Sequence, residues 1–252
     1  MNSLSKNAFS DYIRSKGIVQ VEQGKEYKLK KLITDKDAVE QLYLISEFHK
    51  RTMGYDNYLC HRLEDKRGRT VEEYKIYSRR IKRQYEYIKK KNPRSDFENL
   101  IVQKGEHYIK QGEKAIDEVN NNGYLKLIKR SMDRCEICLG DTYFNNISKG
   151  ENIEVVNLKD CAYNLVEIDG LYFLNKLMKK GIKLDYEKLI ENFCEFERLS
   201  EESVRFIYAL LYYPYEFMKC FSKYMKYSGG IYKDKYKSKL EKLLIHGAQN
   251  LL

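Results

Sequence analysis

Apolar residues recur every three or four positions along most of this chain, which is the spacing of amphipathic helices. Between residues 35 and 53, Val39, Leu42 and Ile45 follow this spacing, and Gly54 is suited to end the helix in a left-handed conformation. The low proline content, two residues in 252, also favours a mainly α-helical chain. The other helices that the pattern predicts cover residues 70–91, 96–119, 124–132, 166–180, 185–198, 200–213, 214–227 and 233–247.

Two short apolar segments interrupt the helical pattern. CEICLGD (135–141) and IEVVNL (153–158) have the length and composition of short buried strands. We expect them to form a hairpin whose loop, TYFNNISKGEN (142–152), carries the polar groups. A third candidate strand, KEYKLKKLI (25–33), lies near the N-terminus. No internal repeat or low-complexity linker divides the chain, which predicts one mainly α domain with a small β element.

The predicted loop has the residue types that a phosphotransferase needs. Such an enzyme places a carboxylate beside the attacking hydroxyl, and an amide or carboxylate where it holds magnesium against the nucleotide phosphates. Asp141 and Asn146, five residues apart, suit these two roles if the loop curls between them. A second metal-binding carboxylate is expected at the end of the next strand, where the chain has Asn157. Taken alone, this spacing fits a polar turn between two strands better than a catalytic loop.

Longer motifs give this loop a context. They are ISEFHKRTMGY (45–55), ICLGDTYFNNI (137–147), VVNLKDCAYNLVEIDG (155–170) and YYPYEFMKCFSKYM (212–225). On them the chain resembles the CotS-type spore-coat family, relatives of aminoglycoside and choline kinases with a protein-kinase-like fold. The resemblance implies a mainly α, kinase-like C-lobe with a small β element over residues 35–252.

The same resemblance implies roles for individual residues. Asp141 stands at the family's base position, and Asn146 and Asn157 stand at its metal and nucleotide positions. Asp169 matches a structural Asp ahead of the following helix. For an active member the resemblance implies ATP and magnesium as ligands. It also implies other spore-coat proteins as partners, and a place in the spore coat after assembly from the mother-cell cytoplasm.

Departures from the family pattern bear directly on activity. Leu139 replaces the His before the loop glycine, Asn157 replaces the metal-binding Asp, and Lys159 replaces the next Asp. An uncharged amide binds magnesium more weakly than a carboxylate, and a lysine has the wrong charge for a metal site. The sequence therefore predicts a degenerate phosphotransferase, in which Asp141 is retained because it accepts backbone hydrogen bonds in a turn.

Ahead of residue 35, family members carry a complete N-lobe, whereas residues 1–34 of this chain contain no glycine-rich loop. Lys28 or Lys30 is the available candidate for a phosphate-binding lysine in this segment. We therefore expect residues 1–34 to be a residual N-terminal segment, with a reduced or absent N-lobe. Because covering the phosphates and excluding water supply much of the catalysis in such enzymes, we also expect no cofactor or metal.

Three functions follow from these observations. The first is a non-catalytic, pseudokinase-like structural or assembly protein of the spore coat. The second is a small-molecule kinase that uses Asp141 as its base, with Asn146 and Asn157 at the metal. The third is a basic nucleic-acid-binding helical protein, because the formal net charge is +10 and residues 79–94 contain eight Lys or Arg among 16 positions. For that segment a solvated helix, with Tyr85 and Ile88 turned inward, is the favoured interpretation.

The remaining chemistry-bearing residues favour structural roles. Six scattered cysteines do not make a dense disulfide framework, which predicts a reducing compartment. Cys135 and Cys138 have metal or redox spacing but no second pair, so a buried strand thiol is expected; Cys60 and His61 are assigned no role. His49 lies on the apolar face of its helix and is expected to be a core histidine with satisfied hydrogen bonds.

Two further features concern partners. No stretch of 18 apolar residues occurs, so no membrane span is predicted. The tyrosine-rich segment YALLYYPYEF (208–217) suggests a packing or assembly surface, which makes self-association a candidate.

Overall fold

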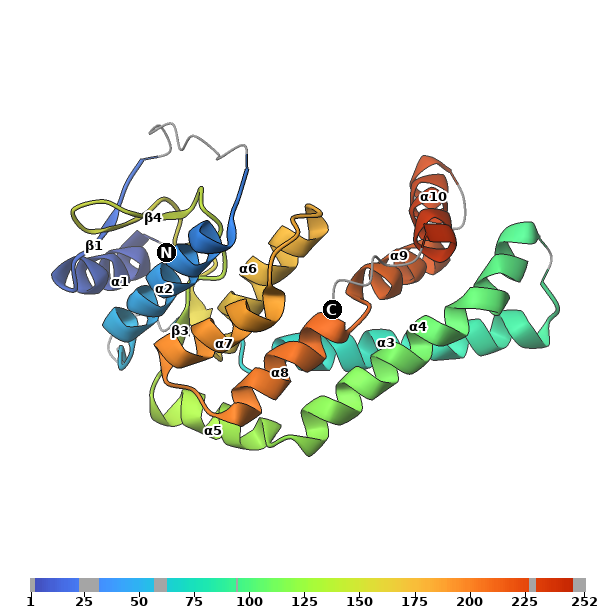
Figure 1. Cartoon of the computed structure of the whole chain (residues 1–252), viewed down its shortest axis with the longest axis horizontal. Coiled ribbons are helices and arrows are strands. Elements are labelled where there is room, and N and C mark those ends of the chain that lie inside the picture. The colour runs from blue at the N-terminus through green and yellow to red at the C-terminus, as the bar shows by residue number, and fades with distance from the viewer. Residues whose placement is uncertain (1–2, 23–31, 57–62, 94, 227–229, 247–252) are drawn as a thin grey trace. The chain divides into compact units, whose positions relative to one another are not determined.

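The computed structural model describes residues 3–22, 32–56, 63–93, 95–226 and 230–246 (Figure 1). In this part of the chain the helices are α1 (Ser3–Ser15), α2 (Asp35–Thr52), α3 (Arg69–Lys90), α4 (Asp96–Asn121), α5 (Tyr124–Asp133), α6 (Glu167–Lys179), α7 (Tyr186–Glu197), α8 (Glu201–Tyr212), α9 (Tyr215–Lys226) and α10 (Ile231–His246). The strands are β1 (Ile18–Gln20), β2 (Glu64–Asp65), β3 (Ile137–Cys138), β4 (Ile147–Lys149), β5 (Ile153–Val155) and β6 (Ala162–Tyr163).

The mainly helical prediction is confirmed. Each helix expected from the apolar spacing is present, with ends displaced by at most two residues. Gly54 has a φ of +84°, the left-handed conformation expected after the first of these helices. Most of the candidate strand at 25–33, including Lys28 and Lys30, lies outside the described residues, as do Cys60 and His61.

Internal contacts divide the chain into two compact units. Unit 1 comprises residues 1–68 and 122–208, and unit 2 comprises residues 69–121 and 209–252. The expected division into a residual segment (1–34) and one domain (35–252) stays a prediction.

Unit 1 is built around α2, which packs against α6, α7, β3 and β4 (Figure 1). The helix begins at a capping box: Thr34 Oγ1 accepts the N–H of Asp37, and the Asp37 carboxylate accepts the N–H of Thr34. These bonds satisfy backbone donors that a helix start otherwise leaves unpaired. Leu44 and Phe48 of α2 join a buried cluster with the strands, so the helix fixes the sheets beneath it.

Two three-stranded sheets complete unit 1, ordered β1-β5-β4 and β2-β6-β3. The predicted hairpin between residues 135–141 and 153–158 is wrong, because β3 pairs with β6 and β5 pairs with β4. Ile147–Lys149, inside the expected loop, is joined to β5 by only three residues. Because the connection is so short, β4 pairs with one edge of β5, and β1 pairs in parallel with the other edge.

Unit 2 consists of α3, α4, α9 and α10, with α3 packed against both α4 and α9. Gly112 of α4 permits close approach, since a Cβ there would lie 2.6 Å from Met218 Cε. On α3, Tyr85 and Ile88 are buried while the basic residues on either side of them, at 79, 80, 82, 83, 89 and 90, are exposed, which confirms the expected orientation of this helix. No helix among the described residues is long and apolar enough to cross a membrane.

Candidate functional site

Asp169 of α6 holds the start of the candidate loop, which runs from residue 139 to 146 between β3 and β4. Its Oδ2 accepts the N–H of Leu139 at 2.6 Å, and its Oδ1 accepts that of Gly140 at 3.0 Å. Gly140 has a φ of +85°, and a Cβ there would lie 2.7 Å from Asp160 Cβ. The glycine is therefore required by both the backbone conformation and the close approach of residue 160. Asp169 thus has a structural role, as expected, but it lies in the first turn of α6 and not ahead of this helix.

Gln41 of α2 holds the same loop from the other side. Its Nε2 donates to the carbonyl of Thr142 at 2.9 Å and to that of Ile147 at 3.3 Å. The Thr142 hydroxyl in turn donates to the Asp169 carbonyl at 3.2 Å. Because Gln41 and Thr142 are buried, these bonds fix the loop between α2 and α6.

Asn146 makes three hydrogen bonds within the protein through its side-chain amide. Its Nδ2 donates to the carbonyls of Asp141 at 2.7 Å and Asn157 at 3.1 Å, and its Oδ1 accepts the N–H of Asn157 at 2.8 Å. The three residues predicted as a site are therefore brought together, through this amide and three backbone groups. Asn146 is buried, so leaving its partners unpaired would carry a desolvation cost.

Asp141 keeps a partly open carboxylate, with its side chain 43% exposed. Its Oδ1 accepts the N–H of Tyr143 at 3.3 Å, so Asp141 does accept the backbone hydrogen bond expected of a turn residue. The same oxygen lies 3.3 Å from Nζ of Lys176, a residue of α6. The sequence did not identify Lys176 as part of the site. Its only indication is a lysine on the helix that follows the loop.

This donor set does not fit magnesium. Asn157 Oδ1 accepts the N–H of Lys159 at 2.9 Å, and Asn146 Oδ1 is occupied as described above. Both are uncharged, whereas magnesium is usually held by one or two carboxylates in near-octahedral geometry. The one carboxylate of the predicted set, Asp141, already lies beside the ammonium group of Lys176. No metal-assisted step is therefore derived for this loop.

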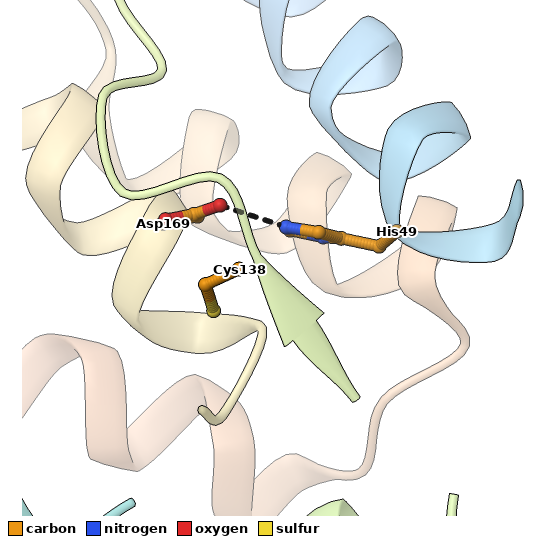
Figure 2. A group of neighbouring side chains, drawn as sticks. All are labelled: His49, Cys138 and Asp169. Atoms are coloured by element: carbon orange, nitrogen blue, oxygen red, sulfur yellow. Dashed lines mark hydrogen bonds and ion pairs between the residues drawn. The ribbon is translucent and has the colours of Figure 1, made fainter. Parts of the chain in front are cut away.

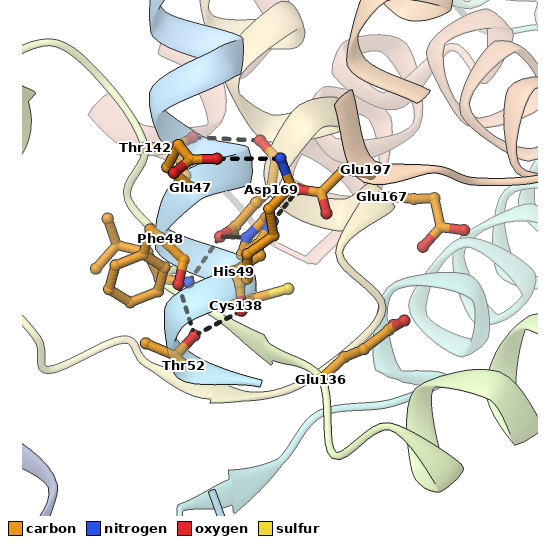
Figure 3. A network of polar contacts seen from close by, with 12 residues as sticks. Glu47, Phe48, His49, Thr52, Glu136, Cys138, Thr142, Glu167, Asp169 and Glu197 are labelled. Atoms are coloured by element: carbon orange, nitrogen blue, oxygen red, sulfur yellow. Dashed lines mark hydrogen bonds and ion pairs between the residues drawn. The ribbon is translucent and has the colours of Figure 1, made fainter. Parts of the chain in front are cut away.

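His49 of α2 lies behind the loop, between two buried carboxylates (Figures 2 and 3). Its Nε2 is 2.9 Å from Asp169 Oδ2, and its Nδ1 is 2.6 Å from Glu197 Oε1. Burial by itself lowers the pKa of His49, but the charge of Glu197 and the hydrogen bonds to both carboxylates raise it to about 10. His49 is thus a charged core histidine whose ring nitrogens both donate, which confirms the expected structural role.

Cys138 lies next to this histidine, and Sγ of Cys138 comes within 4.8 Å of ligand atoms of His49 and Asp169 (Figure 2). Its Sγ donates to the carbonyl of Leu165 at 3.0 Å. Burial, followed by nearby carboxylates, raises the pKa of this thiol well above its ordinary value. A thiol that stays protonated is a poor metal ligand, so the buried strand thiol predicted for Cys138 is confirmed.

A second charged network, which the sequence did not indicate, lies elsewhere in unit 1. Arg130 of α5 forms paired hydrogen bonds with Glu136 (2.9 and 3.1 Å) and with Glu167 (2.8 and 2.7 Å), and donates to Ser203 Oγ at 3.1 Å. Both carboxylates are buried. Such bidentate pairing requires the fork of a guanidinium and ties the helix before β3 to the start of α6.

A groove of unit 1 lies away from Asp141. It has a volume of about 1000 Å³ and lies between α2 and the β4–β5 hairpin. Apolar side chains such as Leu44 and Ile153 line it together with four carboxylates (Asp37, Glu40, Glu47 and Glu151) and two cations (Arg51 and Lys149). The carboxylates outnumber the cations and repel phosphate groups, so the net charge of this lining is unfavourable for a nucleotide triphosphate.

Comparison with known proteins supports the fold. No family model matches the chain. A search of curated proteins also gave no match. Among solved structures, the chain is similar to the crystal structure of an aminoglycoside phosphotransferase from Alicyclobacillus acidocaldarius subsp. acidocaldarius, with a TM-score of 0.66 and 9% sequence identity. The fold is kinase-like. The match covers 86% of this chain and 64% of the matched protein, so the chain spans less than two thirds of that protein's length.

Proposed function

We propose that this protein is a non-catalytic, kinase-like scaffold in which the former catalytic loop has become a packing element. The observation that carries the proposal is the set of three hydrogen bonds by which the Asn146 amide joins Asp141 to Asn157. A residue committed to three internal hydrogen bonds contributes to the free energy of folding and is not available to a metal. Lys176 beside Asp141 adds a positive charge where an active site would need a cation from solution.

We further propose that the scaffold serves in the spore coat, with other coat proteins as partners. The support for this step is the sequence resemblance to CotS-type proteins over residues 45–55, 137–147, 155–170 and 212–225. Exposed tyrosines offer contact surface: Tyr212 is 40% exposed, whereas Tyr213 beside it is buried at 3%. Because the four tyrosines of residues 208–215 are not all buried, self-association through this segment stays a candidate.

A small-molecule kinase is the second candidate function. One observation favours it: Asp169 and Gln41 hold the loop in a single conformation that leaves the Asp141 carboxylate 43% exposed. A positioned, accessible carboxylate is what a general base requires. This function also requires a nucleotide and its metal to bind, for which the present residues are poorly suited.

Nucleic-acid binding is the weakest of the three functions. Residues 79–83 and 86–90 expose basic side chains on α3, while Tyr85 and Ile88 pack inward. Base-stacking aromatics are therefore reduced to Tyr87, which is 54% exposed. A solvated helix face accounts for these charges without a ligand.

Two assays test the proposal. The first measures ATP consumption and phosphate transfer by the full chain with magnesium or manganese, beside Asp141→Asn. The scaffold predicts no turnover in either protein, whereas turnover that Asp141→Asn abolishes would establish the kinase. The second follows a fluorescent fusion in a sporulating host. Recruitment to the developing coat is the expected result, and a diffuse signal throughout sporulation would contradict the coat role.

A further inference from the structure

Three hydrogen-bond donors converge beside Asp141. Lys176 Nζ lies 4.3 Å from the centroid of the Tyr143 ring and 3.3 Å from Asp141 Oδ1. Lys180, one turn later on the same helical path, has its Nζ 4.3 Å from the same centroid and donates to Tyr143 Oη at 2.7 Å. Two ammonium groups and a phenol therefore share one small region with a single carboxylate.

Tyr143 holds the two lysine ammonium groups in defined positions. It is only 3% exposed, and its ring contacts the ring of Phe144 and, at 6.5 Å between centroids, that of Phe173. Its N–H is held by Asp141. Because the ring cannot move freely, it sets the positions of both lysine ends through cation–π contact and the bond to Lys180.

The region has an excess of donors and of positive charge. Each ammonium group offers three N–H donors, and the Tyr143 hydroxyl keeps its own proton to donate after accepting from Lys180. Within the described residues, the ion pairs include one carboxylate for Lys176, that of Asp141, and none for Lys180. Like charges at this spacing on a helix repel each other, so an added anion would relieve the repulsion.

We propose that Lys176, Lys180 and Tyr143 form a binding site for a phosphoryl oxyanion, with Asp141 holding Lys176 in place. A phosphoryl group presents several acceptor oxygens and up to two negative charges, which matches the surplus donors and the net charge of +1 from the two lysines and Asp141. The site goes beyond the scaffold function, since it requires neither nucleotide nor metal. The positive charge of the two lysines also disfavours the binding of cationic ligands beside Asp141.

Isothermal titration of the full chain with inorganic phosphate tests the site, in EDTA and at constant ionic strength. We expect Lys176→Met and Lys180→Met each to weaken binding about tenfold, the loss for one charge-assisted hydrogen bond. Tyr143→Phe keeps the ring and removes the hydroxyl, so a smaller loss is expected. Lys183→Met is the matched control, because Lys183 is exposed just beyond the same helix, and it should change the affinity less than about twofold.

Clear results would overturn the site. One is that the wild type does not bind phosphate. The other is that the wild type binds phosphate but neither lysine substitution weakens the binding, as expected if phosphate associates with other basic surfaces. Binding of tetramethylammonium that Asp141→Asn abolishes would instead make this a cation site and would also overturn it. Circular dichroism checks that each variant folds. If a lysine-to-methionine variant does not fold, Lys176→Gln or Lys180→Gln takes its place. Because no ATP or magnesium is present, this test and the turnover assay fail or succeed independently.

Discussion

His49 Nε2 and the backbone N–H of Leu139 share one oxygen, Oδ2 of Asp169, at 2.9 and 2.6 Å. The histidine comes from α2, and the leucine begins the candidate loop. Asp169 therefore connects the central helix of unit 1 to the segment that a phosphotransferase would use for catalysis. Glu197 of α7 completes the arrangement at 2.6 Å from His49 Nδ1 (Figure 3).

Replacing His49 by leucine should destabilise the protein by about 3–5 kcal/mol, because it leaves Asp169 and Glu197 as buried charges without their cation. The measurement is the free energy of unfolding in urea. Lys50→Ala is the control: Lys50 is the next residue on α2, is exposed, and pairs with Glu47 at the surface. It should change stability by less than about 0.5 kcal/mol. Equal small effects from both substitutions would contradict the role of the histidine.

The His49 network should make stability depend on pH. The folded pKa of His49 is about 10 and its ordinary value is 6.5. Because the folded value is the higher, the stabilisation by protonated His49 is complete below pH 6.5 and is lost as the pH rises through about 10. The difference in unfolding free energy between wild type and His49→Gln should therefore shrink between about pH 6.5 and pH 9.5. Groups that do not contact His49 cancel in this difference, and a constant or growing difference would refute the assignment.

Asn146→Ala should cost about 2–4 kcal/mol, since two carbonyls and one N–H lose their buried partner. Urea unfolding again gives the number. Asn145→Ala is an adjacent control with an exposed side chain, and its effect should stay within about 0.5 kcal/mol. If Asn146→Ala is as mild as Asn145→Ala, the amide does not hold the loop, and the argument for a packing role loses its main support.

Gly140→Ala should destabilise more than Gly181→Ala, although both glycines have a left-handed φ (+85° and +68°). At residue 181 a Cβ would meet no atom within 4 Å, so only the backbone strain of about 1–2 kcal/mol is expected. At residue 140 the same Cβ would lie 2.9 Å from the carbonyl oxygen of Asp160. Thermal unfolding of the two variants separates these contributions, and equal shifts in Tm would show that the close approach is unimportant.

Much of this fold could be predicted from the sequence, because amphipathic spacing reports which side of a helix is buried. That spacing located α2 and α3, and it placed Tyr85 and Ile88 inward. The pairing of β3 could not be predicted in the same way. Strands of two or three residues carry too little pattern to fix a partner, and the choice depended on the short turn between β4 and β5.

The candidate site was predictable in part. The Asp–Asn spacing identified the loop, and the structure joins Asp141, Asn146 and Asn157 by hydrogen bonds. The lysine beside Asp141 was not predictable, because the approach of α6 to the loop is a tertiary contact between residues 35 positions apart. Arg130 was missed for the same reason, since its two carboxylate partners lie on different elements.

We propose that the loop does not hold a metal-bound nucleotide. Isothermal titration with ATP tests it most directly, with and without magnesium, on the wild type and on Asn157→Asp, which restores the missing carboxylate. We expect that magnesium does not promote ATP binding by the wild type, because Asn146 and Asn157 are engaged with the backbone and Lys176 lies beside Asp141. Magnesium-dependent binding by the wild type, tightened further by Asn157→Asp, would contradict it and make the kinase function the better explanation.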